Sequence, residues 1–545
     1  MVYNRTILRN GNGVRMTTNE LLEAKDKIIQ EQAEKLQQMS EQIDELKKSV
    51  ELYRQAAAMA RAARFGSKSE KTVPDGYEEQ PLFNEAEQEA SPKAKEPNLT
   101  PDDAVEVKTH KRKKRSSREE MLKEVPHEEK ICELPEDEQK CEACGSRLIP
   151  VGKKHVRTEV ERIPAQVRVI DYYQMVYKCP ECEKKDTPRM KGAPVPQPVL
   201  QHSMVSASAA AHVLLQKYHF AMPLYRQEAE WAELGLKIPR ATLANWVICL
   251  SRDYLMPLTE LLRKDLLTQA SIHVDETPVQ VLKEPGRKAK TKSYMWVFAS
   301  SRYTRDAHHI RLFRYNASRK GAVARELLKD YHGYLHTDGY KGYNLVNDVT
   351  HCYCWVHLRR LFFQASKSTL ESEGTLAGEA LKMIQELSNK EKEYVEMSTE
   401  ERYAARLKEE TPILEKFWQW IDANQGRCLP KSLLGKAFSY AQNQKDGLLN
   451  YLKYGDCDMT NNVAENSIRP FVVGRKNWEF STAVQGAEAS AAAYSIVETA
   501  KANGLDCRKY LTYLFEKLSQ LDFRSKPNLF EQFLPWNPEI QEKCK

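Results

Sequence analysis

A series of short alternating segments from about residue 270 constrains the fold of this 545-residue chain more than any other feature. Ile272, Val274, Val279 and Val281 alternate with polar residues around Asp275, as expected of a strand with one buried face. Further strands are predicted at 293–300, 309–315, 334–338 and 351–355, with a helix at 320–331. Three strands joined by short turns, followed by helix, strand, helix and strand, predict a mixed sheet.

The order of these elements fits the ribonuclease H-like fold, which carries acidic residues at three positions. Asp275 lies in the first strand, Asp338 ends the fourth strand, and Glu465 falls on a later predicted helix. Carboxylate oxygens bind hard cations, and a pair of Mg²⁺ or Mn²⁺ ions can clamp the attacking and leaving oxygens of a phosphodiester. The three acids therefore predict a two-metal site for cutting DNA.

Each acid also has a plainer explanation. A single Asp at a strand end is usually a turn or cap residue. Glu276 could be the ligand in place of Asp275, although strand alternation sends Glu276 to the opposite face of the sheet. The agreement of all three acids with the positions of one fold favours the catalytic interpretation.

The interval between Asp338 and Glu465 is too long for a bare ribonuclease H fold. Its pattern is helical over 370–424 and 433–454, which predicts a helical insertion. Asp458 is the candidate N-cap of the helix that carries Glu465. The fold class is thus multidomain α+β, with core segments at 266–365 and 456–505, the insertion at 366–455 and a C-terminal helical region at 506–545.

Cationic and aromatic side chains follow the third acid. Arg469 lies one helical turn from Glu465, and Arg475, Lys476 and Trp478 come shortly afterwards. We expect the cations to neutralise DNA phosphates and the indole of Trp478 to stack on a base.

A second pair of candidate DNA contacts follows the fifth predicted strand. His357 and Arg360 are expected to contact DNA or to buttress the acids. The alternative is a zinc site that joins His357 to Cys352 or Cys354, since thiolate ligands select soft zinc over Mg²⁺.

Residues 19–63 are predicted to form a coiled coil, after an unstructured start at 1–18. Apolar residues recur every seven positions, with Glu and Lys on the flanks and no Gly or Pro: Leu22, Ile29, Leu36, Ile43 and Val50. This pattern favours self-association, and a dimer is the expected assembly. The alternative is an amphipathic helix that packs on its own chain.

A polar, charged segment at 64–118 is predicted to be a disordered linker that ends in the basic tract 108–115. The tract either contacts phosphates or is a solvated run of like charge. The net charge of +7 is a weak indication of a polyanionic partner. No apolar run is long enough to cross a membrane, and the scattered cysteines suit a reducing cytoplasm.

Two Cys-x-x-Cys pairs predict a zinc-binding module at 119–200. Cys141 and Cys144 form the first pair, and Cys179 and Cys182 form the second. Four thiolates on tight turns make a closed tetrahedral Zn²⁺ site that is structural, because no coordination position stays open. Two unrelated cysteine pairs are the alternative.

Residues 201–265 are helical by pattern and contain a helix-turn-helix-like spacing. An amphipathic helix at 224–234 is followed by a turn at 235–238 and by a second helix that starts near Pro239. Arg240, Thr242 and Asn245 would then face a DNA groove. A plain helical hairpin is the alternative.

These segments together resemble the DDE transposases of the insertion sequence 66 family, from about residue 16 to residue 523. The resemblance rests on the coiled coil, both Cys pairs and an ordered set of motifs: Phe65-Gly-Ser-Lys-Ser-Glu-Lys71, His-Val-Asp275-Glu-Thr, Thr-Asp338-Gly-Tyr, Cys354-Trp-Val-His357-Leu-Arg-Arg360, Asn461-Asn-Val-Ala-Glu465-Asn-Ser-Ile-Arg469-Pro, Gly474-Arg-Lys-Asn-Trp478 and Tyr494-Ser-Ile-Val-Glu-Thr-Ala-Lys-Ala-Asn-Gly504. Residues 1–15 lie outside this pattern, so Met16 is a candidate start.

The resemblance implies that Asp275, Asp338 and Glu465 form a catalytic triad that cuts DNA and transfers strands. Asp275 would bridge two Mg²⁺ or Mn²⁺ ions, with the other two acids holding one each. The implied partners are double-stranded DNA, namely the terminal inverted repeats and the target, a second copy of the chain, and accessory transposition proteins. The implied location is the bacterial cytoplasm, at the nucleoid.

Two other functions stay open from the sequence. A zinc-containing DNA-binding regulator would also use the zinc module, the helix-turn-helix and the coiled coil. A ribonuclease H-like nuclease without strand transfer would use the same acids.

Overall fold

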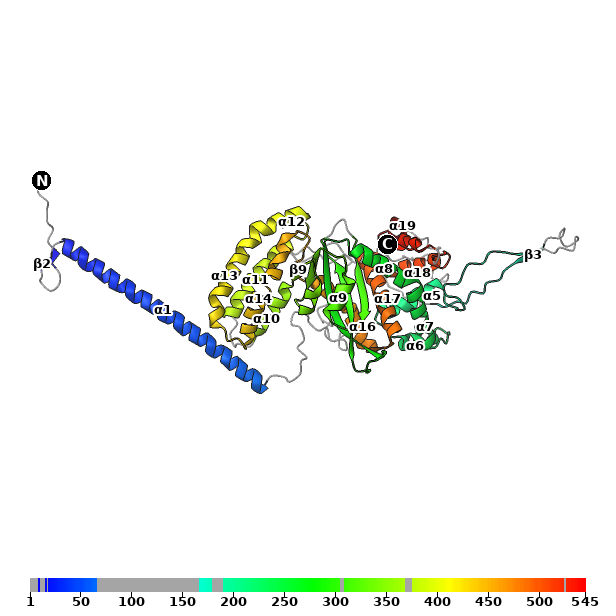
Figure 1. The fold of residues 1–545 in the computed structure, drawn as a ribbon, viewed down its shortest axis with the longest axis horizontal. Coiled ribbons are helices and arrows are strands. Elements are labelled where there is room, and N and C mark those ends of the chain that lie inside the picture. The colour runs from blue at the N-terminus through cyan, green and yellow to red at the C-terminus, as the bar shows by residue number, and fades with distance from the viewer. Residues whose placement is uncertain are drawn as a thin grey trace, which may run out of the picture. The chain divides into compact units, whose positions relative to one another are not determined.

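The computed structural model describes residues 8–9, 15–16, 18–65, 166–178, 190–303, 308–367, 375–523 and 526–545 (Figure 1). The chain divides into two compact units, one made of residues 1–70 and 167–545 and the other of residues 71–166. The fold within the first unit is mixed α+β, as predicted. No helix of the described part is long and apolar enough to cross a membrane.

A mixed sheet of six strands lies at the centre of the first unit, counted over the described residues. Its strands are β5 (Ser271–Lys283), β6 (Lys292–Ser300), β7 (Arg311–Asn316), β8 (Tyr334–Thr337), β9 (Thr350–Tyr353) and β10 (Phe480–Ala483). The order is β7-β6-β5-β8-β9, with β5, β6 and β7 antiparallel and β5, β8 and β9 parallel. β10 runs parallel to the distal part of β5, where Phe480 pairs with Gln280.

Burial explains why these segments are strands. Ile272, Val274, Val279 and Val281 of β5 are buried, which confirms the predicted alternation. In the central strand β6 the whole run 295–299 is buried, as expected where both faces of a sheet are covered.

Helix α17 (Val484–Ala502) covers the edge strand β7. Ser495 Oγ accepts the backbone N–H of Phe313 at 2.7 Å, and Thr499 Oγ1 accepts that of Arg311 at 3.0 Å. The two hydroxyls also donate to the carbonyls of the same two residues. An open strand edge invites pairing with another chain, so these contacts close one side of the sheet.

Helices before, between and after the strands share the hydrophobic core of the sheet. They are α5 (Ala207–Tyr218), α6 (Leu224–Glu233), α7 (Arg240–Leu250), η2 (Ser251–Leu255), α8 (Met256–Leu266), α9 (Gly321–Leu327), η3 (Lys341–Leu345), α16 (Asn462–Trp478), α17, α18 (Cys507–Leu518), η7 (Pro527–Phe533) and α19 (Pro538–Cys544). The two helices expected on either side of the turn at 235–238 are α6 and α7. Gly235 lies in that turn with φ of +88°, a conformation that favours glycine.

A second hydrophobic core joins most of the helices between β9 and α16. The described helices of this interval are α10 (Trp355–Lys367), α11 (Leu376–Glu393), α12 (Thr399–Ala405), η4 (Arg406–Glu410), α13 (Thr411–Asn424), η5 (Gln425–Arg427), α14 (Leu433–Asn443), α15 (Lys445–Leu449) and η6 (Asn450–Lys453). Figure 1 shows most of them as a group drawn in yellow-green to orange. The helical pattern predicted for the insertion is confirmed.

The long N-terminal helix is also confirmed, as α1 (Thr18–Phe65). Its heptad residues Leu22, Ile29, Leu36, Ile43 and Val50 are between 47% and 66% exposed. Near its C-terminal end the Gln55 side chain donates to the Arg427 carbonyl and accepts from the backbone N–H of Leu429. The pairing of α1 with a second chain stays a prediction.

Short strands lie in the N-terminal third of the chain. β1 (Leu8–Arg9) pairs antiparallel with β2 (Arg15–Met16), so the start differs from the unstructured segment expected there. β3 (Val176–Lys178) pairs with β4 (Met190–Gly192). The four predicted zinc ligands and the linker at 66–118 lie outside the described residues.

Candidate active site

Two neighbouring parallel strands bring the first two acids together. β5 pairs with β8 in a register that sets Ser271 beside Tyr334 and His273 beside His336. Asp275 lies two residues beyond the last pair on β5, and Asp338 lies two residues beyond it in the turn that follows β8. Residues two apart share a face of a strand, and the rings of His273 and His336 stack on that face with centroids 4.3 Å apart.

Asp338 begins the turn that follows β8. Its Oδ1 accepts the backbone N–H of Tyr340 at 2.8 Å, an Asx-turn contact. Gly339 has φ of +82°, which lets the chain turn away at once. Tyr440 of the insertion donates to the Asp338 carbonyl at 3.1 Å, so both parts of the fold hold this turn.

Glu465 reaches the same place from the first turn of α16. The pKa of Asp275 is well above its usual range because the carboxyl is buried and because the charges of Glu276, Glu465 and Asp338 act on it. The side chain of Glu465 is 13% exposed and that of Asp338 is 29% exposed. The other two predicted acids therefore lie near enough for their charges to act on Asp275, and solvent still reaches the side chains of both.

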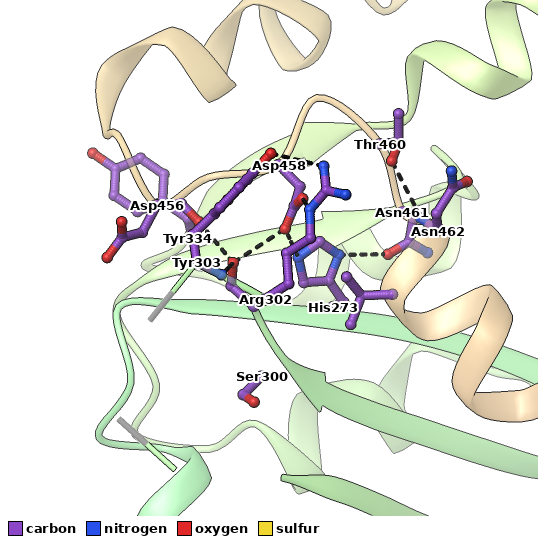
Figure 2. Close-up of polar contacts among 12 residues, drawn as sticks. His273, Ser300, Arg302, Tyr303, Tyr334, Asp456, Asp458, Thr460, Asn461 and Asn462 are labelled. Carbon is purple, nitrogen blue, oxygen red and sulfur yellow. Dashed lines mark hydrogen bonds and ion pairs between the residues drawn. The ribbon is translucent and has the colours of Figure 1, made fainter. Parts of the chain in front are cut away.

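The segment before α16 is tied to the sheet through Asp458, a contact that Figure 2 shows. Asp458 Oδ2 lies 3.0 Å from His273 Nε2 and accepts a hydrogen bond from Ser301 Oγ at 3.1 Å. Its Oδ1 accepts from Arg302 Nε at 2.7 Å. Asp458 is 1% exposed, and its pKa is lowered by these partners against the effect of burial.

The prediction that Asp458 caps the helix of Glu465 is therefore wrong. The helix starts at Asn462, and Asn461 occupies the N-cap position without a side-chain cap bond. Between Asp458 and the helix the chain turns into the core, so the carboxylate binds partners on β5 and in the loop after β6. Asp458 does not cap the start of the helix. It anchors the segment before the helix to β5 and to the loop after β6.

Asn461 makes the last contact before the helix. Its Nδ2 donates to the Val274 carbonyl at 2.9 Å, and its Oδ1 lies 3.1 Å from His273 Nδ1. Its backbone N–H donates to Cys354 Sγ at 3.1 Å. The carbonyl of Val274 immediately precedes Asp275, so Asn461 links the backbone of the first acid directly to the helix of the third.

Arg319 is a residue of the site that the sequence did not reveal. It pairs with Glu276 Oε1, its Nη2 lies 3.9 Å from Asp338 Oδ2, and its guanidinium lies 4.1 Å from the Tyr340 ring. Tyr343 donates to the other oxygen of Glu276. Glu276 is thus engaged by structural partners, which leaves Asp275 as the acid beside Glu465. No motif surrounds Arg319, and only the fold brings it to Asp338.

His357 lies beside Glu465. Its Nδ1 is 3.8 Å from Glu465 Oε1, and burial is the main cause that lowers its pKa, with Arg360 acting in the same direction. Cys354 Sγ, a His357 ring nitrogen and a Glu465 oxygen all lie within 4.8 Å of one another. The buttressing role and the zinc alternative both stay predictions, and Cys352 belongs to a different group of side chains.

The carboxylates suit divalent cations. The principal influences on Asp275 are burial and three other carboxylates, so the cluster gathers negative charge that a cation would neutralise. Oxygen donors are the ligands that Mg²⁺ and Mn²⁺ prefer. Asp275, Asp338 and Glu465 would hold them.

The predicted DNA contacts on α16 fall into two groups. Arg469 and Lys476 are exposed. Arg475 is half-buried, and its guanidinium donates to Thr277 Oγ1 at 3.1 Å and to the Pro278 carbonyl. Trp478 packs between Tyr218 and Tyr494, with Lys217 Nζ 4.7 Å from its ring. Arg475 and Trp478 thus have intramolecular partners, and their DNA contacts stay predictions.

The predicted contacts on α7 lie on its outer side. Arg240 and Asn245 are exposed and Thr242 is half-buried, while Leu243 and Trp246 face the core. The spacing between α6 and α7 fits either a DNA-binding unit or a plain hairpin.

Three family models match the chain. The model of the IS66 family transposase matches residues 202–489, more than half of the 545 residues and including all three acids. The zinc-finger binding domain of transposase IS66 matches 138–183, which contains both Cys-x-x-Cys pairs and supports a structural zinc ion there. The IS66 C-terminal element matches 495–536.

Curated relatives occur in Sinorhizobium fredii (strain NBRC 101917 / NGR234). The uncharacterized protein y4hP is 25% identical over 410 residues, which cover 72% of each chain. The uncharacterized protein y4jD is 27% identical over 405 residues, which cover 72% of this chain and 77% of the relative. The names of these relatives state no activity. The matched family models, in contrast, cover the zinc-binding segment, the acidic site and the C-terminal helices. The chain therefore belongs to the IS66 transposase family.

Proposed function

We propose that this transposase cuts and joins DNA at a site formed by Asp275, Asp338 and Glu465. The observation that carries the proposal is the proximity of three carboxylates from β5, the turn after β8 and α16: burial raises the pKa of Asp275, and the charges of Glu276, Glu465 and Asp338 raise it further. A regulator that only binds DNA has no use for such a cluster. Membership in the transposase family supports the same conclusion.

The sheet supports a ribonuclease H-like core. Three antiparallel strands are followed by two parallel strands in the order β7-β6-β5-β8-β9, and the acids lie on the first strand, after the fourth and on a later helix. The insertion between β9 and α16 has its own hydrophobic core, so it can lengthen the interval before Glu465 without changing the sheet.

Two divalent cations, when bound, would activate water or a 3′-hydroxyl for in-line attack and stabilise the charge that develops on the phosphate. Of the three acids, Asp275 is the one that would contact both cations, because the charges of both other acids act on it. Asp458 and Asn461 keep the Glu465 helix in register with β5. Arg319 pairs with Glu276 and lies 3.9 Å from Asp338, so it offsets part of the negative charge beside the three acids.

DNA would approach along surfaces that carry exposed cations. Arg469 and Lys476 lie on the helix of Glu465, and Arg240 and Asn245 lie on the outer side of α7. We assign phosphate contacts to the first pair and base contacts in the terminal inverted repeats to the second. The zinc module would add to DNA binding, and accessory proteins would take part in assembly.

We also propose that α1 pairs with a second copy of the chain, because two DNA ends must be cut together. Five heptad residues of this helix are about half exposed or more, and a coiled coil would bury them. The protein would act on DNA in the bacterial cytoplasm, at the nucleoid.

The test is cleavage of labelled DNA that carries the ends of the element from which this gene comes. The wild type is incubated with Mg²⁺, with Mn²⁺ or with neither, beside the Asp275→Asn variant. We expect nicking at the element end that requires the metal and is lost in the variant, followed by joined products when target DNA is added.

Two other results would each favour a different function. Tight binding without cutting in either protein, with accessory proteins present, would favour a regulator. Metal-dependent nicking without joined products would indicate a nuclease without strand transfer.

A further inference from the structure

A second group of metal-binding side chains lies beneath the carboxylates and has no part in the proposed reaction. It consists of His336 on β8, Cys352 on β9 and Cys457 in the segment that precedes α16. One ligand atom of each residue lies within 4.8 Å of the other two. All three residues are at most 1% exposed.

The backbone fixes two of these ligands side by side. β8 and β9 are parallel, and His336 and Cys352 are direct partners in their register. Side chains at paired positions point to the same face of a sheet. Cys457 comes from the opposite direction, in a turn where its N–H donates to the Tyr454 carbonyl at 3.1 Å.

The imidazole of His336 is available for coordination. Its ring is held by stacking on His273, with centroids 4.3 Å apart and an angle of 16° between the planes. Its Nε2 is buried and has no hydrogen bond of ordinary geometry within the described ranges, while the neighbouring Cys352 thiol interacts with the same imidazole. A buried polar nitrogen without a partner is unfavourable, and a metal ion would satisfy it.

The two thiols are buried in the core close to this imidazole, with the ligand atoms of all three residues within 4.8 Å of one another. Burial raises the pKa of Cys457 well above its usual value. Burial acts on Cys352 in the same direction, but the neighbouring Cys457 and His336 bring its pKa down to about 5.

We propose that His336, Cys352 and Cys457 bind a thiophilic divalent cation, for which zinc is the best fit. Two thiolates and a neutral imidazole neutralise a Zn²⁺ ion, so the completed site carries no net charge into the core. Sulfur and imidazole select zinc over the Mg²⁺ or Mn²⁺ that the carboxylates prefer. Water is the ordinary fourth ligand where a protein supplies three.

Three protein ligands and a water make an open zinc site, but this zinc would take no part in the proposed reaction and would act on the catalytic acids only through the backbone. It would join β8, which ends one residue before Asp338, to the segment that leads through Asp458 into the helix of Glu465. The site differs from the four-cysteine module, whose cysteines lie at 141–182. It also differs from the zinc alternative that includes His357, because Cys352 points to His336.

The test is the zinc content of the full-length protein, purified without chelators and measured by mass spectrometry of the released metal. We expect the double variant Cys352→Ser/Cys457→Ser to contain about one zinc ion per chain fewer than the wild type. Cys507→Ser is the matched control, since Cys507 is also a buried cysteine but lies in the other hydrophobic core, and it should keep the wild-type content. This measurement does not depend on DNA cleavage.

A second measurement leaves the proposed site intact, in case the double variant does not fold. Cys141→Ser/Cys144→Ser removes the other zinc site, and the protein is then loaded with Co²⁺. We expect a thiolate-to-cobalt charge-transfer band that disappears when Cys457→Ser is added. Absence of that band, unchanged zinc in the double variant, or a Cys352–Cys457 disulfide in the unreduced protein would overturn the proposal.

Discussion

Two groups of ionisable side chains in the core differ in whether their charges balance. In the insertion, Arg406 binds Glu391 through two hydrogen bonds of 2.6 and 2.9 Å, and Arg402 lies 3.1 Å from Asp456. Glu410 is the fifth member, and burial together with the nearby Glu391 raises its pKa to about 8. With Glu410 protonated, two positive charges meet two negative charges.

The carboxylate site lacks this balance. Arg319 pairs with Glu276, and the pKa of Asp275 is raised by burial and by carboxylates. A buried group of like charges is unfavourable unless something neutralises it. The comparison indicates that the charges of the insertion cluster balance within the chain, whereas bound cations would be needed to balance those of the carboxylate site.

The largest expected effect comes from removing a ligand of the carboxylate site. Glu465→Gln should lower the rate of DNA cleavage on the order of 10³-fold or more while DNA affinity stays the same, because only a metal ligand is lost. Cleavage and binding are measured on the same labelled DNA. Glu488→Gln, an exposed acid on α17, is the control. Retained cleavage in Glu465→Gln would mean that the third acid is a different residue.

The next prediction concerns the insertion cluster, where a substitution should change stability without changing cleavage. Arg406→Leu leaves Glu391 buried without its partner and should reduce the free energy of unfolding by about 3–5 kcal/mol. Denaturant unfolding measures the change, and cleavage per folded molecule should not fall. The double variant Arg406→Leu/Glu391→Leu should recover part of the loss. If it recovers none, the pair is not what stabilises this part of the insertion.

A smaller effect is expected at Asp458, which anchors the segment before α16 to the sheet. Asp458→Asn weakens the contacts to His273 and Arg302 and should reduce the free energy of unfolding by about 1–3 kcal/mol. It should also raise the Mn²⁺ concentration needed for half-maximal cleavage, because the Glu465 helix is held less firmly. Asp253→Asn, which breaks a surface pair with Arg252, is the control. Lower stability with unchanged metal dependence would limit Asp458 to holding the fold.

The last prediction concerns pH. Glu410 has a folded pKa of about 8, above that of the unfolded chain, so the folded state keeps its proton longer. Its contribution therefore makes stability fall as pH rises from about 4.5 to 8, by at most about 1.4 kcal/mol per pH unit. Glu410→Gln keeps an acceptor for the Tyr451 hydroxyl and should flatten this slope. An unchanged slope in urea unfolding across that range would contradict the assignment.

Local patterns predicted the parts of the fold that depend on local residues. The alternation around Asp275 predicted β5, the heptads predicted α1, and the helical pattern predicted the insertion. Asp338 could be located because it follows a strand and precedes a glycine. Such signals lie within a few residues of the feature that they predict.

Contacts between distant segments could not be predicted in this way. His273 and Asn461 meet across 188 residues, and Ser301 and Asp458 meet across 157. Asp458 precedes a helix, so its position in the sequence resembles that of an N-cap, and the turn of the chain into the core carries no local signal. Arg319 and Cys457 were missed for the same reason.

The most direct test of the comparison is the thermal unfolding of the DNA-free protein with and without Mn²⁺. A ligand that binds only the folded state stabilises it, by about 2.7 kcal/mol at a concentration 100 times its dissociation constant. We predict that Mn²⁺ raises the unfolding temperature of the wild type but not that of Asp275→Asn, and that without Mn²⁺ the variant is the more stable protein, since repulsion is relieved. An equal response of both proteins to Mn²⁺, or no response of the wild type, would contradict the claim that cations complete this site.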